Sequence, residues 1–317
     1  MSEASFTKGL GALTRLGETG PSNVQWTEEQ ANSWYERQPW LVGANYTPSN
    51  AINQLEMWQA DTFDADLIDK EFALAESLGM NTLRIYLHDL LWQHDPEGFV
   101  DRIDTVLSLA AKRGIRPMLV LFDSCWHPAP ALGIQPAPLP GVHNPGWVQS
   151  PGAEAMCNPA HHQRLEDYIK GIVGTFAEDP RILVWDVWNE PDNINDASYA
   201  ERTQKLEYVE RLLHKVFAWA RSQWPTQPLT SGVWVGEWDT DQKLTPIRKI
   251  QLHQSDVISF HNYEEPEKLQ AAIDSLRRFN RPLFCTEYMA RGQQSTFEGS
   301  LPIGKSGKVA MINWGLV

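Results

Sequence analysis

The stretch Ile182-Leu183-Val184-Trp185-Asp186-Val187-Trp188-Asn189-Glu190-Pro191 is an apolar run that ends in two polar residues and a proline. A short apolar run of this kind is typical of a buried strand in a parallel sheet. Seven similar runs occur along the chain, at residues 41–46, 82–87, 116–123, 228–234, 257–263, 282–288 and 309–317. The sequence therefore predicts eight strands, and one of them ends in Glu190.

Helical segments separate most of these strands, which determines the fold class. Amphipathic patterns cover residues 66–78, 99–112, 161–177, 201–223 and 266–278, with a shorter connection at 245–255. Alternating strands and helices indicate parallel βαβ units, and eight strands close a (β/α)8 TIM barrel, an α/β fold. An open doubly wound sheet is disfavoured because no glycine-rich phosphate loop follows the first strand.

The two ends of the chain are expected to differ from a complete barrel. Residues 1–40 predict an N-terminal extension with a short helix at 27–37, and residues 41–317 predict the catalytic barrel. The eighth strand runs to Val317 without a further helix. Either the chain is truncated there, or the N-terminal helix covers the face that the last helix would cover.

Composition excludes several classes of partner. The chain has 27 Lys and Arg against 40 Asp and Glu, a formal net charge of −13, so we expect no nucleic-acid partner and no anionic membrane surface. No apolar run approaches the ~18 residues of a membrane span. We expect a monomer without cofactor or metal. No signal peptide is visible, which predicts a cytoplasmic protein by default, or a periplasmic or secreted one if the chain has been trimmed.

Tryptophan and proline point to a binding surface at the barrel mouth. The chain holds 14 Trp, and flat exposed indoles are surfaces on which sugars stack. The connection at residues 124–160 carries 8 of the 21 prolines, which predicts a rigid wall on the face where barrel enzymes place their active sites. Candidate sugar platforms at strand ends or in loops are Trp92, Trp126, Trp147, Trp234 and Trp238.

Polar residues on the predicted strands supply candidate chemistry. In the second strand, alternation turns Arg84 into the barrel, where it needs an acidic partner. Glu190 and Glu287 each end a strand, and His261 and Tyr263 share one face of another. Paired carboxyl groups suit glycosidic bond cleavage, which requires one protonated and one ionised carboxyl.

These residues, in this order, resemble glycoside hydrolase family 5, a cellulase- and mannanase-like family in the clan of retaining (β/α)8 glycosidases. The motifs that carry the resemblance are Trp188-Asn189-Glu190-Pro191, His261-Asn262-Tyr263, Thr286-Glu287-Tyr288 and Asn313-Trp314, with Arg84 upstream, and together they span about residues 41–317.

The resemblance implies a role for each residue. Glu190 is similar to the acid/base and Glu287 to the nucleophile. Asn189 would bind the sugar 2-hydroxyl, Arg84 and Tyr263 would support the nucleophile, His261 would neighbour the acid/base, and Trp314 would form the floor of the −1 subsite. The family usually has a histidine near the end of the third strand. This chain has none there, so Asp123 or the following loop, which contains Trp126, would take its place. Asn45 and Trp234 are further expected pocket residues.

The resulting hypothesis is a retaining β-glycosidase that acts by double displacement on a β-linked oligo- or polysaccharide. Retention requires the carboxyl groups to lie about 5–5.5 Å apart, against ~6.5–9.5 Å for inversion. Strict alternation cannot turn both Asn189 and Glu190 inward, so we expect a bulge or a strong twist there. A catalytically silent carbohydrate-binding barrel and a transglycosylase are the alternatives. Manno-, gluco- and xylo-configured substrates stay open, as does endo or exo action, which depends on whether the loop at 124–160 blocks one end of the cleft.

Overall fold

The structure is a computed structural model that describes residues 24–141, 144–195 and 204–317. Its strands are β1 (Val42–Tyr46), β2 (Thr82–Tyr86), β3 (Met118–Val120), β4 (Val184–Asp186), β5 (Leu229–Thr230), β6 (Ile258–His261), β7 (Leu283–Glu287) and β8 (Ala310–Asn313). Its helices are α1 (Glu28–Glu36), α2 (Gln54–Trp58), α3 (Ala65–Ser77), α4 (Asp89–His94), α5 (Pro96–Lys112), α6 (Ala153–Cys157), α7 (His162–Thr175), α8 (Lys205–Arg221), α9 (Pro246–Gln254), α10 (Pro266–Leu276) and α11 (Phe297–Ser306). All eight predicted strands are present.

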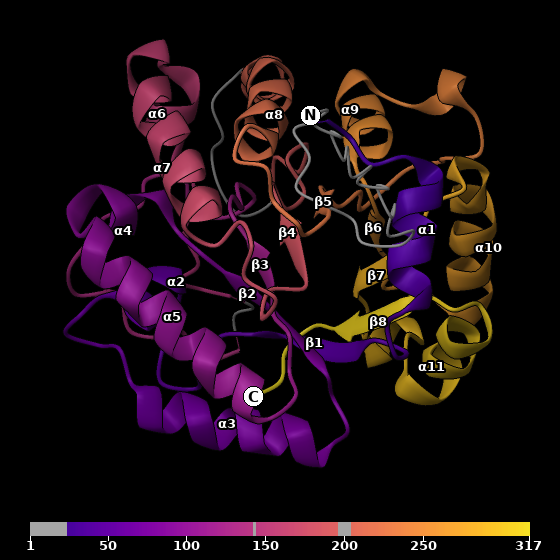
Figure 1. The fold of residues 1–317 in the computed structure, drawn as a ribbon, viewed down its shortest axis with the longest axis horizontal. Coiled ribbons are helices and arrows are strands. Elements are labelled where there is room, and N and C mark those ends of the chain that lie inside the picture. The colour runs from indigo at the N-terminus through magenta and orange to yellow at the C-terminus, as the bar shows by residue number, and fades with distance from the viewer. Residues whose placement is uncertain (1–23, 142–143, 196–203) are drawn as a thin grey trace, which may run out of the picture.

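The strands form one parallel sheet in the order β5-β4-β3-β2-β1-β8-β7-β6, with helices on its outer side (Figure 1). The two outermost strands of this order meet through a single bridge between Val233 and Phe260. Beside it, the Thr230 and Ser259 hydroxyls are hydrogen-bonded at 2.8 Å. The sheet is thus a nearly closed (β/α)8 TIM barrel, which confirms the predicted fold.

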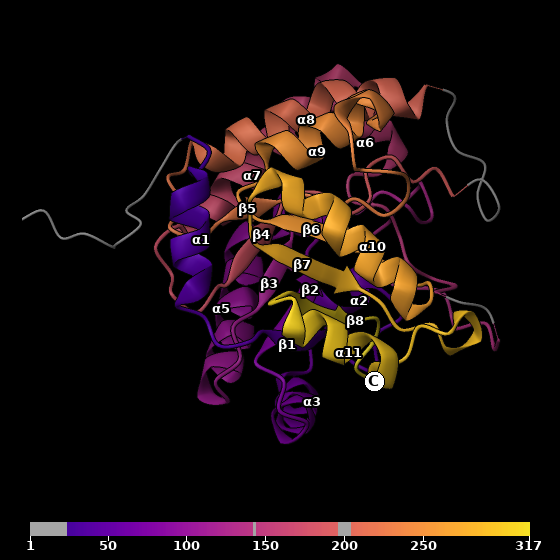
Figure 2. The same ribbon diagram turned by 90° about the vertical axis from the view of Figure 1, so that its right-hand side faces the viewer.

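The N-terminal helix α1 packs across the end of the barrel at which the strands begin (Figure 2). Its Trp34 stacks on Phe284 of β7, with ring centroids 6.4 Å apart, and Trp26 joins the same buried cluster. The Trp26 amide donates to Asp256, which precedes β6. Trp26 and Trp34 therefore lie at the end of the barrel where the strands begin. The polar residues lie at the opposite end. Four residues follow β8.

Four helices were not predicted from the sequence, namely α2, α4, α6 and α11. The first three have five or six residues, too few to show a helical period. The fourth contains Pro302, which reads as a helix breaker in a sequence. Helix α6 also lies inside the proline-rich connection at 124–160. No helix of the described residues is long and apolar enough to cross a membrane.

Candidate active site

The polar residues singled out from the sequence converge at the carboxyl ends of the strands. Arg84, Glu287 and seven further side chains form one buried hydrogen-bonded network, the others being Asn45, Tyr86, Asp123, Asp186, Asn189, Glu190 and His261. Tyr263 joins it from the rim. Parallel strands of a barrel bring their carboxyl ends together, which is why residues more than 200 positions apart meet here.

Arg84 of β2 lies at the centre of the network and is fully buried. Its Nη1 donates to Glu287 Oε1 at 2.8 Å, and its Nη2 donates to Asp186 Oδ2 at 2.6 Å and to Asn189 Oδ1 at 2.7 Å. Arg84 therefore has two acidic partners, Glu287 and Asp186, where the sequence predicted one. Asp186 was missed, although alternation along its strand could have placed it inward with Arg84.

Tyr86, two residues after Arg84 on the same face of β2, is a second residue without a predicted role. Its hydroxyl accepts from Arg84 Nη1 at 2.6 Å and lies 2.9 Å from Asn45 Oδ1 and 3.2 Å from Glu287 Oε1, either of which can take its proton. Asn45 in turn donates to the carbonyl of Thr286 at 2.8 Å. Side-chain hydrogen bonds beside Glu287 thus join strands β1, β2 and β7.

The Glu287 carboxylate is held by donors on both oxygens. Oε1 accepts from Arg84, and Oε2 accepts from the Tyr263 hydroxyl at 2.7 Å. Burial raises the pKa of Glu287, but the positive charges of His261 and Arg84 and these hydrogen bonds outweigh burial, so its pKa lies below the ordinary value. Burial also raises the pKa of the Tyr263 phenol, which therefore stays a donor. The surroundings of Glu287 therefore favour its ionised form.

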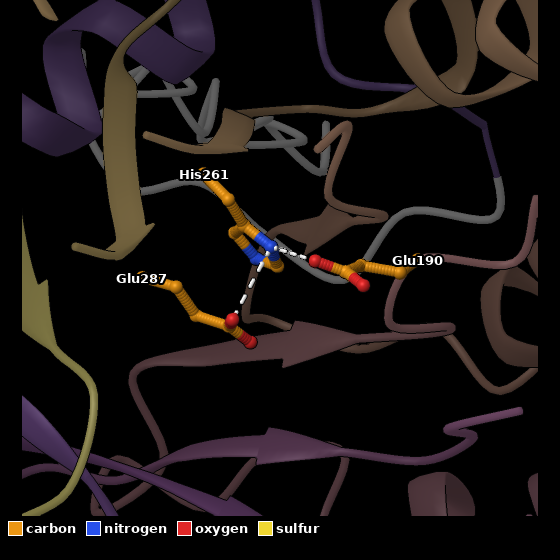
Figure 3. Close-up of side chains that lie close together, drawn as sticks. All are labelled: Glu190, His261 and Glu287. Atoms are coloured by element: carbon orange, nitrogen blue, oxygen red, sulfur yellow. Dashed lines mark hydrogen bonds and ion pairs between the residues drawn. The ribbon is translucent and has the colours of Figure 1, made fainter. Parts of the chain in front are cut away.

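Glu190 faces Glu287 across His261 (Figure 3). His261 Nδ1 lies 2.5 Å from Glu190 Oε1 and 3.5 Å from Glu287 Oε2. The second oxygen of Glu190 accepts from Asn193 Nδ2 at 2.7 Å. The carbonyl of Asn193 is held by the Lys205 ammonium at 2.8 Å. Asn193 lies in a loop with no pattern of its own, and nothing in the sequence marks it.

The glutamates and His261 offer three atoms within 4.8 Å of one another, which is compatible with metal ligation. A cation at this point would lie beside the Arg84 guanidinium, which already neutralises Glu287. The arrangement therefore favours two carboxyl groups acting on an organic substrate over a metal centre.

Irregular backbone turns both glutamates toward each other. Asp186 and Asn189 both reach Arg84 although they are three residues apart, which regular alternation forbids, and Glu190 has a left-handed φ of +40°. The register between β6 and β7 skips one residue at Thr286. The irregularity expected at residues 189–190 is confirmed, and the bulge in β7 is an additional finding.

Asp123 occupies the end of the third strand, where the resemblance implied a histidine. It is 1% exposed, and its Oδ1 accepts from Cys125 Sγ at 3.0 Å and from Asn189 Nδ2 at 3.3 Å. Its Oδ2 has no hydrogen-bond partner among the described residues. Burial raises the pKa of Asp123 to about 6; the two hydrogen bonds oppose this change, and the charges of Glu190 and Glu287 add to it.

Four aromatic side chains form a wall beside this network, which we call the aromatic wall: Tyr86, Trp126, Trp147 and Trp314. The Trp147 ring centroid lies 4.9 Å from that of Tyr86, 5.9 Å from that of Trp314 and 6.2 Å from that of Trp126. Trp126 and Trp147 both come from the proline-rich connection after β3. This connection therefore contributes directly to the site, as expected.

Two cavities are lined by residues of this network or its rim. The β1–β8 cavity has about 310 Å³ and is lined by Asn45, Tyr86, Trp147 and Trp314. The β5–β6 cavity has about 650 Å³ and is lined by His261, Tyr263, Trp234 and Trp238, together with the charged residues Glu237, Asp239, Lys243, Glu264 and Lys268. The Trp234 indole N–H donates to Asp192 at 2.8 Å. Trp92 is not a platform, because it packs against Gly171 of α7.

Comparisons with known proteins agree with this geometry. The model of the family described as Cellulase (glycosyl hydrolase family 5) matches residues 42–315. No curated protein matches the chain.

Solved structures share the fold at low identity. A β-mannanase from the blue mussel Mytilus edulis is 14% identical with a TM-score of 0.64, over 87% of this chain and 87% of that one. An endo-1,4-beta-mannanase from Rhizomucor miehei is 13% identical with a TM-score of 0.61, over 88% and 86%. An exo-beta-1,4-mannosidase from Opitutaceae bacterium strain TAV5 is 21% identical with a TM-score of 0.60, and the match covers 86% of this chain but 51% of that one.

Proposed function

The chain belongs to glycosyl hydrolase family 5, and we propose that it cleaves β-linked glycans with retention, Glu287 acting as nucleophile and Glu190 as acid/base. It is an O-glycosyl hydrolase with a carbohydrate substrate. The single observation that carries the two-glutamate mechanism is the facing pair, whose carboxylate oxygens approach within 4.8 Å across His261.

The separation supports retention over inversion. Inverting enzymes hold their carboxyl groups about 6.5–9.5 Å apart to accommodate a water molecule, whereas retaining enzymes hold them about 5–5.5 Å apart. One oxygen of Glu190 lies within 4.8 Å of one oxygen of Glu287, an approach that is compatible with the shorter separation. This approach favours direct attack by Glu287 on the anomeric carbon.

The surroundings of Glu287 suit the nucleophile. Arg84 and Tyr263 stabilise its carboxylate before attack, and the same donors bond the ester once the glycosyl–Glu287 bond has formed. Glu190 donates its proton to the leaving glycosidic oxygen in the first step. In the second step it takes a proton from water, which attacks the anomeric carbon and releases Glu287.

The remaining polar residues are suited to position the sugar. Asn189 lies between Arg84 and Asp123, so its amide is oriented before substrate arrives and can bind the 2-hydroxyl of the sugar at the reaction centre. The unpaired Oδ2 of Asp123 is available to a neighbouring hydroxyl. Trp314 provides the apolar floor. A silent binding barrel is disfavoured, because a binding module needs neither the facing carboxyl groups nor the buried charges that hold them.

The test compares the wild type with Glu287→Gln on separate β-mannan, β-glucan and xylan samples, with chromatography of the released sugars. Glu210→Gln, an exposed change on α8, is the matched control. We expect products from one polymer with the wild type and the control, and none with Glu287→Gln. Near-wild-type activity of Glu287→Gln would overturn the assignment of the nucleophile.

Azide assigns Glu190 independently. In Glu190→Ala, the small anion can enter and attack the glycosyl–Glu287 intermediate without base catalysis. We expect azide to restore turnover of an activated aryl β-glycoside and to yield the β-glycosyl azide. Formation of the α-glycosyl azide would show that the two roles are exchanged.

A further inference from the structure

The proline-rich connection after β3 is hydrogen-bonded to the segment that runs from the end of the β1–α2 loop through α2. Asn53 Nδ2 donates to the Gly146 carbonyl at 2.8 Å, and Gln54 Nε2 donates to the Val148 carbonyl at 3.3 Å. Ile52 packs so closely on Gly146 that a Cβ at this glycine would lie 2.6 Å from its side chain. The two segments are in direct contact.

A second set of bonds extends this junction. Gln59 and Gly133 exchange two hydrogen bonds, with Gly133 N donating to Gln59 Oε1 at 2.6 Å and Gln59 Nε2 donating to the Gly133 carbonyl at 3.0 Å. Asn53 Nδ2 also donates to Gln135 Oε1 at 2.8 Å. We call the contact of residues 52–59 with residues 133–135 and 145–148 the β1–β3 strap.

The strap borders the β1–β8 cavity. This cavity is lined on one side by residues 47–49, 51 and 52, on another by Pro145 and Trp147, and on a third by residues 315–317. Ile52, Pro145 and Trp147 belong to the strap. Toward the barrel axis it is lined by Asn45, Tyr86 and Trp314, of which Asn45 and Tyr86 bond to Arg84. The cavity therefore extends from the Glu287 network to the junction of these two chain segments.

The chemistry of cleavage determines which part of the glycan enters this cavity. The nucleophile bonds to the anomeric carbon, so the sugar beside Glu287 is the glycone, and any units attached to it continue toward the non-reducing end of the chain. The leaving group lies on the side of Glu190. His261, which lies 2.5 Å from Glu190, and Trp234, whose indole donates to Asp192 two residues after Glu190, line the β5–β6 cavity. Tyr86, whose hydroxyl lies 3.2 Å from Glu287 Oε1, lines the β1–β8 cavity. The β1–β8 cavity is thus the glycone side.

We propose that the enzyme acts from the non-reducing end and accepts no more than two sugar units on the glycone side, because the β1–β3 strap closes that end of the site. This inference rests on the proposed function. The leaving-group side is different, because its cavity has about twice the volume and is lined by exposed charged residues such as Glu237 and Asp239. A long glycan can therefore extend in that direction.

The test uses hexasaccharides of β-1,4-linked mannose, glucose and xylose that carry a fluorescent label at the reducing end. We expect the first labelled products to be the pentamer or the tetramer, with the unlabelled monosaccharide or disaccharide in equal amount. Labelled trimer or shorter sugars among the earliest products would overturn the inference while leaving hydrolysis itself intact. No cleavage of any hexasaccharide or aryl β-glycoside would overturn the proposed function, and this inference with it.

A variant of the strap gives a second readout. Asn53→Asp keeps the side-chain oxygen that caps α2 through the Glu56 amide but removes the amide donor to Gly146 and Gln135, and Ile52→Ala removes the packing on Gly146. The double variant should open the closed end and raise the share of labelled trimer among the first products by roughly tenfold. Glu29→Gln, an exposed change on α1, is the control and should leave the product pattern unchanged.

An unchanged product pattern in a folded double variant, verified by near- and far-UV circular dichroism, would contradict the role given to the strap.

Discussion

The two halves of the barrel mouth are built by different means. The half around β1, β2 and β8 is closed by aromatic rings and by the β1–β3 strap, and the side chains in its cavity are uncharged. The half around β5 and β6 carries three carboxylates and two lysines around a larger cavity. Aromatic walls bind a sugar by area and shape, whereas exposed charges stay hydrated and adapt. Under the proposed function, we expect strict recognition of the glycone and tolerance of the leaving group.

Arg84→Met tests the network that both halves share and should have the largest effect. It leaves Asp186 and Glu287 as buried carboxylates without their common partner. Removing one partner of a buried ion pair costs about 3–5 kcal/mol, so we expect a clear fall in the free energy of unfolding by urea titration and loss of activity by roughly 10³-fold or more. A stable, active variant would show that the two halves are held independently.

Trp147→Ala and Trp234→Ala compare the halves directly. Trp147 contacts three rings of the aromatic wall, while Trp234 is half-buried beside the β5–β6 cavity. We expect kcat/KM on oligosaccharides to fall roughly 100-fold for Trp147→Ala and less than about tenfold for Trp234→Ala. Equal losses in steady-state kinetics would break the comparison.

Asp123→Asn tests the buried network between the two halves by its effect on the free energy of unfolding. The folded pKa of about 6 lies above the ordinary value of 3.8. Stability from this carboxyl is therefore fully present below pH ~4 and is lost as pH rises to 6. The variant should be more stable than the wild type by up to about 2–3 kcal/mol at pH 8 and equal to it at pH 4. Thermal unfolding at both pH values checks this, and equal differences at pH 4 and pH 8 would contradict it.

Tyr263→Phe should shift the pH profile of activity and sharpens the account of the β6 side. The Tyr263 hydroxyl helps to hold the pKa of Glu287 below its ordinary value. Because a depressed pKa keeps the nucleophile ionised in acid, loss of this donor should move the acidic limb of the kcat/KM profile to higher pH and lower kcat by about tenfold. An acidic limb at the wild-type position would show that Arg84 and His261 suffice.

The barrel and most of its polar centre could be predicted from the sequence because both depend on local pattern. Apolar runs identify strands, and parallel strands bring their polar ends to one place, so Glu190, Glu287, Arg84 and His261 were found without coordinates. The direction of Glu287 could not be predicted, since it depends on the bulge at Thr286. Asn193 and the strap partners Asn53 and Gly146 were also missed, because loop contacts between distant segments leave no periodic signal.

The central claim is that Glu287 attacks the anomeric carbon, and the stereochemistry of the first product tests it most directly. Proton NMR during the first minutes of hydrolysis of an aryl β-glycoside distinguishes the anomers before they equilibrate. The account predicts that the β-anomer of the free sugar appears first and that the α-anomer grows in later by mutarotation. Initial release of the α-anomer would contradict it, since that product requires direct attack by water.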